Sequence, residues 1–425
     1  MRDMKDSGVE WIGEIPVDWS LIRFKDKWKN VKEVAGASSE EYERLALTLN
    51  GVIKRPKDDS EGLQPKAFDG YQILRENNFV FKMIDLQNVS TSRVGLSPYT
   101  GLVSPAYIRF APKADGQYSK FAYYFLMSMY YNCVYNNLGG NGVRSALNAS
   151  DMGSFYIPWP DEHTQVAIAE FIDAQMVKVD ALIANVQTQI EKLKAYKQSL
   201  ITEVVTKGLD PAVPMKDSGV EWLGSVPEKW AVHRIANLYS ERSENGRADL
   251  PILTVSINTG VSDYEVADAD KDRVFNRMED RSKYKRVCPG DLTYNMMRAW
   301  QGAFGAVRVD GMVSPAYVVA KPKNPGQIDS RYIEALLRTP SAIEEMHRYS
   351  RGIVDFRLRL YWPEFRSIHI CLPPIEEQTQ IADYIDEKSK QIDKLIAIKQ
   401  KKIDKLNEYK KSLIYEYVTG KREVV

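Results

Sequence analysis

An internal duplication is the feature that most constrains the fold of this 425-residue chain. A shift of about 212 residues lays one half over the other, and such a repeat has to be recognised before secondary structure is assigned. MKDSGVEWIGEIPVDW at residues 4–19 recurs as MKDSGVEWLGSVPEKW at residues 215–230, with 11 of 16 positions identical. GLVSPAYIRFAPK at 101–113 recurs as GMVSPAYVVAKPK at 311–323. Chance does not produce matches in the same order at nearly the same offset, so both halves contain one shared frame.

Between the repeated blocks the halves diverge. EVAGASSEEYERLALTLNGVIKRPKDDSEG in the first half has little in common with ERSENGRADLPILTVSINTGVSDYEVADAD in the second. This pattern indicates a duplicated scaffold that carries two different recognition surfaces.

The divergent inserts predict an α+β fold. FVFKMI at 79–84 and LTYNMM at 292–297 are typical of strands, as are SPAYIRF and SPAYVVA. A helix is expected after them, from Ser119 in the first half and from Ser330 in the second. Its aromatic face in the first half is expected to be buried core rather than a ligand platform, and consists of Tyr123, Tyr124, Tyr130 and Tyr131.

A third repeated block closes each half and predicts a long helix. IAEFID, DALIA and YKQSLITEVVT, between residues 168 and 206, recur as IADYID, DKLIA and YKKSLIYEYVT between 381 and 419. Pro160-Asp161 and Pro373-Pro374 precede the blocks, where helix starts tolerate proline. Gly208 and Gly420 follow the last periodic residues, where helices commonly stop.

Both long helices contain a seam whose spacing averages 3.5 residues, which favours a coiled coil in which each helix is the other's partner. About 39 residues would make a rod roughly 58 Å long. The first seam consists of Ile168, Ile172, Gln175, Val179, Ile183, Val186, Ile190, Leu193, Lys197, Leu200 and Val204. The second consists of Ile381, Ile385, Lys388, Ile392, Ile396, Lys399, Ile403, Leu406, Lys410, Leu413 and Tyr417. The polar members keep open the alternative of two long helices that pack only on globular cores.

Composition and charge exclude several classes of protein. The length suggests two or three domains, and 44% apolar with 27% charged residues indicates a folded chain. The net charge of +1 means that any nucleic-acid surface is local. Cys133, Cys288 and Cys371 form no C-x-x-C pair and the four histidines lack metal-ligand spacing, so neither a disulfide frame nor a metal site is expected. The N-terminus carries no apolar signal core and the apolar stretch 121–135 is too short for a bilayer, which predicts a cytoplasmic protein without a membrane span.

The sequence predicts no catalytic site. It contains no phosphate-binding G-x-x-x-x-G-K-[ST] loop, no G-x-S-x-G elbow and no HExxH motif. An adenine methyltransferase would be expected to carry an Asn/Asp-Pro-Pro-aromatic tetrapeptide. The nearest string, LPPIEE at 372–377, belongs to the start of a helix.

The inserts hold what basic excess the chain has, with net charges of +4 for residues 20–157 and +3 for residues 231–370. Such an excess is compatible with DNA phosphates, and arginine also reads guanine through two hydrogen bonds. Basic and amide side chains on expected loops are therefore candidates for DNA contact, with solvated surface charge as the alternative for any one of them. The candidates are Lys54, Arg55, Lys57, Lys82, Asn141 and Arg144 in the first half, and Arg281, Lys283, Lys285, Arg298, Arg351 and Arg357 in the second.

The repeated motifs resemble those of a known family. KDSGVEWIGEIPVDW, KDSGVEWLGSVPEKW, the VSPAY segments, PPIEEQTQIADYID and the closing KSLIYEYVTGK and QSLITEVVTKGLD resemble the specificity subunit of type I restriction-modification enzymes. The likeness covers essentially the whole chain. One departure is WPDEHTQ, which has His163-Thr164 where the second half has Glu376-Glu377. This departure leaves the cap of the first helix in question.

The resemblance implies two α/β target recognition domains joined by two long helices that form an antiparallel coiled coil, with a pseudo-two-fold internal repeat. The domain boundaries expected on this basis are 1–157 for the first frame and recognition domain, 158–208 for the first spacer helix, 209–370 for the linker, second frame and second recognition domain, and 371–425 for the second spacer helix and tail.

The function implied by the resemblance is DNA recognition without catalysis. Each recognition domain would read one half of a split, asymmetric site in double-stranded DNA, and the helices would set the gap between the halves. The helices would also dock two modification (methyltransferase) subunits, to which two ATP-dependent restriction subunits are added. S-adenosylmethionine, ATP and Mg are expected on those partners, and no cofactor on this chain. Two alternatives are a purely structural coiled-coil scaffold and a self-sufficient DNA methyltransferase, and the missing tetrapeptide argues against the second.

Overall fold

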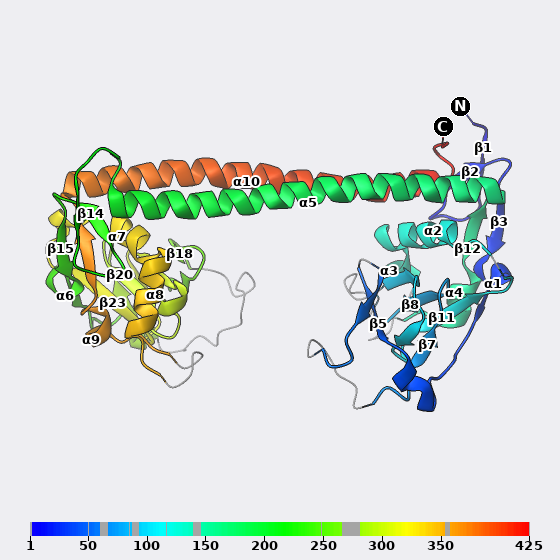
Figure 1. Cartoon of the computed structure of the whole chain (residues 1–425), viewed down its shortest axis with the longest axis horizontal. Helices are drawn as coiled ribbons and strands as arrows, with labels where there is room; N and C mark the ends of the chain where they lie inside the picture. The colour runs from blue at the N-terminus through cyan, green and yellow to red at the C-terminus, as the bar shows by residue number, and fades with distance from the viewer. Residues whose placement is uncertain are drawn as a thin grey trace. The chain divides into compact units, whose positions relative to one another are not determined.

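The computed structural model of the chain describes residues 2–49, 51–59, 67–84, 86, 93–115, 117–138, 146–247, 249–265, 281–352 and 358–424. It divides into two compact units. Unit 1 contains Met1–Gln187 and Lys401–Val425, and unit 2 contains Thr188–Gln400. The division falls within two long helices, α5 (Glu162–Lys207) and α10 (Ile375–Val418), so each unit consists of a segment of both helices and a globular head (Figure 1).

The head of unit 1 begins and ends in short antiparallel pairs. Strand β1 (Met4–Asp6) pairs with β2 (Glu14–Pro16), and β3 (Ser20–Arg23) pairs with β12 (Tyr156–Trp159). The second pair returns the chain from the divergent insert to the residues that precede α5.

Two four-stranded sheets make up the insert of unit 1. The first has the order β4-β11-β8-β9, with β4 Trp28–Asn30, β11 Ile108–Pro112, β8 Phe79–Lys82 and β9 Arg93–Leu96. The second has the order β6-β5-β10-β7, with β6 Gly51–Arg55, β5 Arg44–Thr48, β10 Gly101–Val103 and β7 Gln72–Leu74. The helices of this head are α1 (Phe24–Lys27), α2 (Lys120–Tyr131), α3 (Val134–Leu138) and α4 (Ala149–Ser154).

One hydrophobic core joins the head of unit 1 to both long helices. Trp19, Phe24 and Phe121 belong to the same buried cluster as Ile172 of α5 and Val418 of α10. Helix α2 lies against α5, and its Lys120 and Tyr124 side chains both bond to the Asp173 carboxylate. The expectation of a buried aromatic face is confirmed for the two tyrosines of α2 that are 8% exposed, Tyr124 and Tyr130.

Unit 2 repeats this order of elements. The antiparallel pairs are β13 (Met215–Asp217) with β14 (Ser225–Pro227) and β15 (Ala231–Arg234) with β24 (His369–Leu372). A four-stranded sheet has the order β16-β23-β20-β21, with β16 Tyr239–Glu241, β23 Tyr317–Pro322, β20 Leu292–Asn295 and β21 Phe304–Ala306. Two further pairs are β17 (Val255–Ser256) with β18 (Gly260–Val261) and β19 (Lys285–Val287) with β22 (Gly311–Val313). The helices of this head are α6 (Ile235–Leu238), α7 (Ser330–Leu337), α8 (Pro340–Tyr349) and α9 (Trp362–Phe365).

The head of unit 2 is likewise fixed to both long helices. Its core contains Trp230 and Tyr332 together with Val205 of α5 and Ile381 of α10. The buried Tyr332 hydroxyl donates to the Val205 carbonyl oxygen at 3.0 Å. Ring burial and a satisfied hydroxyl together hold helix α7 against the end of α5.

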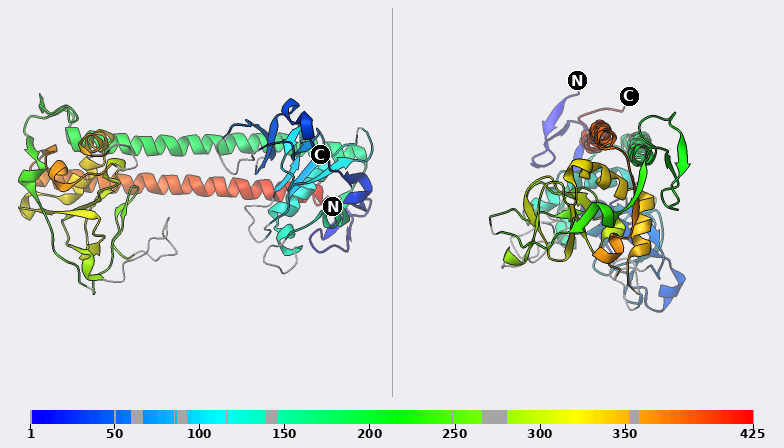
Figure 2. Two further views of the ribbon diagram at one scale, coloured as in Figure 1. Left: turned by 90° about the horizontal axis from the view of Figure 1, so that it is seen from below. Right: turned by 90° about the vertical axis from the view of Figure 1, so that its left-hand side faces the viewer.

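Within each unit α5 and α10 lie side by side and run in opposite directions (Figure 2). In unit 1 the rings of Phe171 and Tyr417 are 4.6 Å apart, and Lys410 Nζ lies 2.5 Å from Asp180 Oδ1. In unit 2 Lys399 Nζ donates to Gln189 Oε1 at 2.5 Å, and Lys197 Nζ lies 2.7 Å from Asp393 Oδ2. Every seam position expected from the sequence is buried or half-buried. Three of its lysines therefore make bonds between the helices instead of interrupting the seam.

The ends of the long helices lie where the sequence predicts them. Gly208 and Gly420 adopt φ values of +80° and +69°, the left-handed conformation that glycine adopts most readily at a helix C-terminus. At the start of α5, the Asp161 carboxylate accepts from the Thr164 hydroxyl at 2.6 Å and from the Thr164 backbone N–H at 3.0 Å, and these hydrogen bonds lower the pKa of Asp161. The unusual WPDEHTQ sequence thus still caps its helix.

Several expected strand boundaries are wrong by a few residues. Strand β8 ends at Lys82 and β20 at Asn295, because the methionines that follow leave the sheet. The SPAYIRF and SPAYVVA segments begin in turns that follow β10 and β22, and their strands start only at Ile108 and Tyr317. Lys54 and Arg55, which were expected on a loop, belong to strand β6, because Gly51 begins a strand that pairs with β5.

Candidate nucleic-acid interface

In unit 2 several basic residues gather where strand β20 leaves its sheet. Asn295 ends the strand, and its side-chain Oδ1 accepts from the Met297 backbone N–H at 3.0 Å. The Arg298 N–H donates to the Asn295 carbonyl at 3.0 Å, and the Trp300 indole N–H donates to the Met297 carbonyl at 3.0 Å. These three bonds fold residues 295–300 into a tight turn that projects from the sheet.

Two other segments lie against this turn. The Leu360 N–H donates to the Met296 carbonyl at 2.9 Å, and Arg359 exchanges two backbone hydrogen bonds of 2.9 Å with Arg351. On the other side, Lys285 Nζ donates to the carbonyl of Tyr317, the residue that pairs with Asn295. We call this group the unit 2 strand-exit site; it consists of Lys285, Asn295, Met297, Arg298, Arg351 and Arg359. The structure thus brings together three residues predicted from separate parts of the sequence, namely Lys285, Arg298 and Arg351.

The cations of this site differ in whether they already have a hydrogen-bond or ion-pair partner within the protein. Arg351 lies 2.6 Å from Glu364, and Lys285 bonds to a carbonyl oxygen. Arg298 is half-buried and Arg359 is exposed, and no described residue offers either guanidinium group a hydrogen bond or an ion pair. Arg298 lies close enough to Tyr317 to oppose the rise in the pKa of that phenol that burial causes. Arg298 and Arg359 are therefore the two cations of this site best able to bind an external anion or base.

Unit 1 has an equivalent site at the end of strand β8. The Leu147 N–H donates to the Met83 carbonyl at 3.1 Å, as Leu360 does to Met296 in unit 2. Ile84 forms an isolated β-bridge with Ala146. We call Lys82, Ile84 and Ala146 the unit 1 strand-exit site. Lys82, predicted from the sequence, is half-buried here, and its ammonium group has no described partner.

Lys54, Arg55 and Lys57 form a different kind of cluster. Lys54 Nζ lies 2.5 Å from Glu43, which raises the pKa of Lys54, Arg55 lies 2.5 Å from Asp59, and Lys57 lies 3.2 Å from Glu40. With neighbouring acidic residues they line a cavity of about 530 Å³. Because these cations are paired, their attraction for phosphate is partly neutralised.

The remaining predicted residues lie elsewhere or outside the described parts of the chain. Arg281 donates to the Leu250 carbonyl at 3.1 Å and lies 3.2 Å from Glu265, and Lys283 is exposed in the same short 3-10 helix. Asn141, Arg144 and Arg357 fall outside the described residues. In the sequence Arg144 and Arg357 stand three positions before Leu147 and Leu360, the leucines that bond to the two strand-exit sites.

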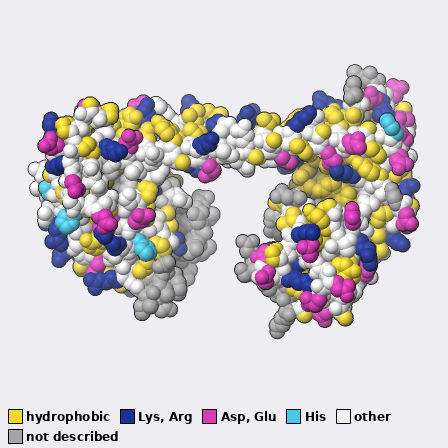
Figure 3. Space-filling model, viewed as in Figure 1, with side chains coloured by type: hydrophobic (Ala, Val, Ile, Leu, Met, Phe, Trp, Pro, Cys, Tyr) yellow, Lys and Arg dark blue, Asp and Glu magenta, His cyan; other side chains and the backbone are white. Residues whose placement is uncertain are grey.

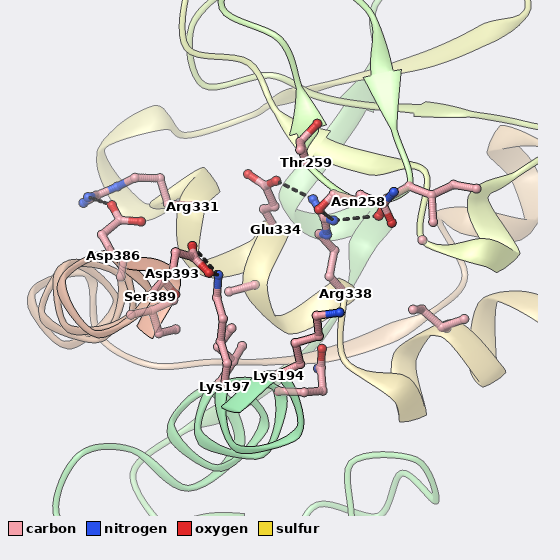
Figure 4. Close-up of a pocket in the computed structure, with 18 of the residues that line it drawn as sticks. Lys194, Lys197, Asn258, Thr259, Arg331, Glu334, Arg338, Asp386, Ser389 and Asp393 are labelled. Atoms are coloured by element: carbon pink, nitrogen blue, oxygen red, sulfur yellow. Dashed lines mark hydrogen bonds and ion pairs between the residues drawn. The ribbon is translucent and has the colours of Figure 1, made fainter. Parts of the chain in front are cut away.

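A large groove in unit 2 lies between helix α7 and the long helices (Figure 4). Its volume is about 910 Å³, and its charged lining is already paired. Arg331 lies 2.8 Å from Asp383 and 3.2 Å from Asp386, and Arg338 donates to the carbonyls of Ile257 and Asn258. The corresponding groove of unit 1 is aromatic, with a volume of about 500 Å³, and is lined by residues that include Tyr123, Tyr124, Met127 and Tyr131. We interpret these grooves as joints between head and helices rather than as ligand sites.

Sequence reasoning missed Ile84, Met297, Trp300 and Arg359. The signal that points to the first two is the equivalence of Lys-Met-Ile and Asn-Met-Met, each of which begins at the last residue of its strand. Among the described residues, no group of three or more His, Cys, Asp or Glu side chains is arranged to hold a metal. None of the described helices is both long and apolar enough for a bilayer crossing.

The structure thus defines a protein of two units, in each of which a head with a strand-exit site is fixed to a segment of both long helices. Residues 47–195 match a family model described as the type I restriction modification DNA specificity domain. The chain is 24% identical over 433 residues to the type I restriction enzyme MjaVIII specificity subunit of Methanocaldococcus jannaschii, covering 96% of this chain and 94% of that protein. It is 23% identical over 430 residues to the putative type I restriction enzyme MjaX specificity subunit of the same organism, covering 97% and 96%.

A solved structure shares the fold. This structure concerns complex assembly and conformational transition of the type I R-M system. One of its chains superposes on this protein with a TM-score of 0.63 at 12% sequence identity. The match covers 95% of this chain and 98% of that one. The resemblance seen in the repeated motifs is therefore confirmed: residues 47–195 match the DNA specificity domain, and nearly the whole chain is similar to type I specificity subunits.

Proposed function

We propose that this protein reads a bipartite, asymmetric DNA site, with the head of each unit contacting one half of it, and that it catalyses no reaction itself. The observation that carries the proposal is the pair of strand-exit sites. They occupy equivalent positions in a duplicated frame but present different side chains, Lys82 and Ile84 in unit 1 against Asn295, Met297 and Arg298 in unit 2. The same backbone support with different contact residues is what two readers of unlike half-sites need, because base edges are distinguished by side chains.

We propose further that α5 and α10 form an antiparallel coiled coil that sets the gap between the half-sites. Support comes from the buried seam residues Val186 and Ile403 in unit 1 and Ile190 and Ile392 in unit 2. The lysines of the seam that bond across to the other helix add specificity of register.

The outer surface of the helices supports docking of two copies of one partner. Leu182 and Leu395 occupy equivalent positions of the repeat, as do Tyr196 and Tyr409, and they are 48%, 48%, 58% and 46% exposed. Hydrophobic side chains lie between basic ones along the helices in Figure 3. Apolar residues retained at exposed positions in both repeats are best explained by a protein interface.

We propose that these partners are methyltransferase subunits that bring S-adenosylmethionine, with two ATP- and Mg-dependent restriction subunits joining them in the cytoplasm. On this view the chain itself binds no cofactor.

An insert exchange tests the proposal. The chain is produced with its methyltransferase partner, and methylated adenines are mapped in the host genome. Replacing residues 20–157 or 231–370 by the insert of another specificity subunit is expected to change one half of the methylated sequence and leave the other half intact. A change in both halves, or methylation without any sequence preference, would overturn the proposal in favour of a structural scaffold.

A further inference from the structure

We propose that Ile84 and Met297 are apolar base-contact residues, each of which packs against a thymine methyl group in the major groove of the half-site that its head reads. The inference rests on the proposed function and extends it to a class of contact and to residues that the charge pattern does not reveal.

The two residues are equivalent in both sequence and structure. In each unit a methionine comes directly after the end of the strand, Met83 in unit 1 and Met296 in unit 2, and the contact residue follows it. The carbonyl of this methionine accepts a hydrogen bond from a leucine N–H. Much of the two inserts diverges, yet both carry an exposed aliphatic side chain at this position, Ile84 in unit 1 and Met297 in unit 2.

Both side chains are open to solvent. Ile84 is 44% exposed and Met297 is 43% exposed, whereas Met83 beside Ile84 is 1% exposed. A single exposed aliphatic residue is ordinary in a soluble protein. Two of them at equivalent positions, each at a site that holds a cation with no described partner, indicate a shared contact role.

The backbone that carries both side chains is held in place before any ligand arrives. The bridge between Ile84 and Ala146 fixes the first. The Asn295 side chain and the Trp300 indole, both bonded to Met297 backbone atoms, fix the second. A contact residue held in this way loses less conformational entropy on binding.

The charges around these residues favour DNA over a protein as the occupant. Lys82 stands beside Ile84, and Arg298 and Arg359 stand beside Met297, and none of the three side chains has a described partner. Arginine suits guanine or phosphate, and an apolar side chain suits the C5 methyl of thymine, which no other base of unmodified DNA carries. Together they form a surface that can read an A·T pair next to a G·C pair.

The test uses the assembled complex with its methyltransferase partner. Binding is measured on the cognate duplex and on duplexes in which single thymines are replaced by uracil, which lacks only the methyl group. In the wild-type complex we expect one uracil position in each half-site to weaken binding about fourfold, the value of one buried methyl group. In Met297→Ala that penalty disappears in the half-site read by unit 2 and persists in the other. Ile84→Ala shows the reverse.

Val34→Ala, a change at a 53% exposed aliphatic residue of unit 1 outside the strand-exit site, serves as the control and should keep both uracil penalties. Thermal unfolding of each variant checks that the fold is intact. Wild-type binding by both alanine variants, or uracil penalties that persist in them, would overturn the inference while leaving bipartite recognition in place. A wild-type complex that binds the cognate duplex and every uracil duplex equally would also overturn the inference, whereas equal binding to a duplex of unrelated sequence would remove the proposed function itself.

Discussion

Lys197 Nζ lies 2.7 Å from Asp393 Oδ2, joining α5 to α10 within unit 2. The same pair occurs in unit 1 with its members exchanged between the helices, because Lys410 is the repeat equivalent of Lys197 and Asp180 is that of Asp393. A contact that recurs in both units with its members exchanged is what a duplicated pair of antiparallel helices produces. The lysines that weakened the coiled-coil interpretation at the level of sequence are therefore among its best supports.

Reversing one charge of this pair is expected to destabilise unit 2 slightly. Asp393→Lys places two ammonium groups together, and we expect the free energy of unfolding in urea to fall by about 0.5 to 1 kcal/mol, the scale of a partly exposed ion pair. The exchange Lys197→Asp with Asp393→Lys should restore most of the loss. Lys192→Asp, at an exposed position of α5 without a described partner, measures the cost of aspartate in the helix by itself. Equal losses in the single and exchanged variants would argue against a direct interaction.

Lengthening both helices by one heptad tests their role as a spacer. Seven residues inserted after Gln187 and seven after Gln400 keep the seam in phase and add about 10.5 Å. At about 3.4 Å per base pair, the gap of the methylated sequence should grow by about three base pairs, while both half-sites stay the same. Inserting four residues instead rotates the seam out of phase, so that variant should lose stability. An unchanged gap in the heptad variant would contradict the spacer role.

Arg298→Ala is expected to weaken binding to one half-site. The guanidinium group has no described partner that it would have to leave on binding DNA. If it contacts a base, its removal should make the binding free energy less favourable by about 1 to 3 kcal/mol. Arg366→Ala removes an exposed arginine of the same unit that also lacks a described partner and lies at the end of α9. Fluorescence anisotropy on cognate duplexes should separate the two variants. Equal affinity for both would remove Arg298 from the interface.

Gly420→Ala is expected to loosen the end of α10 in unit 1. A Cβ there would lie 2.4 Å from a ring carbon of Pro16, in addition to the strain of φ +69°. Gly219→Ala introduces the same φ of +69° with no atom within 4 Å, so it isolates the backbone cost of about 1 to 2 kcal/mol. We expect Gly420→Ala to lower Tm further than Gly219→Ala does. The additional loss in the free energy of unfolding is the cost of overpacking, about 1 to 3 kcal/mol. Matching Tm values for the two variants would mean that the Pro16 contact relaxes without cost.

Leu182→Asp and Leu395→Asp test the proposed docking surface. Each places a charge on one of two equivalent exposed patches, so each should remove one copy of the methyltransferase subunit and leave the other bound. Native mass spectrometry of the purified complex reads the stoichiometry directly. Lys178→Asp, an exposed change on the same face of the repeat, controls for added negative charge. Loss of both copies in a single variant, or of neither, would contradict two independent patches.

Much of the architecture was predictable from the sequence. Gly208 and Gly420 marked the ends of both long helices, because a left-handed residue at a helix end is a local requirement. The seam was visible because heptad spacing is also local. Strand ends were less predictable, since apolar residues of FVFKMI continue past Lys82, where strand β8 ends.

The candidate site could be predicted from the sequence only in part. Lys285, Arg298 and Arg351 were chosen separately from their residue types, and only the structure brings them to one sheet end. The sequence did not distinguish them from Lys54 and Arg55, whose charges are paired with Glu43 and Asp59. Pairing depends on how the side chains are placed in the folded chain, and an acidic residue a few positions away in the sequence does not by itself show that an ion pair forms.

The sequence by itself determined the duplication, the two long helices and their seam, because each of these follows from repeated residues or from periodic spacing along the chain. Only the tertiary structure decided which cations stay available and which aliphatic side chains face solvent. Both properties depend on long-range contacts such as the hydrogen bond from Leu360 to Met296, which joins residues 64 positions apart in the sequence.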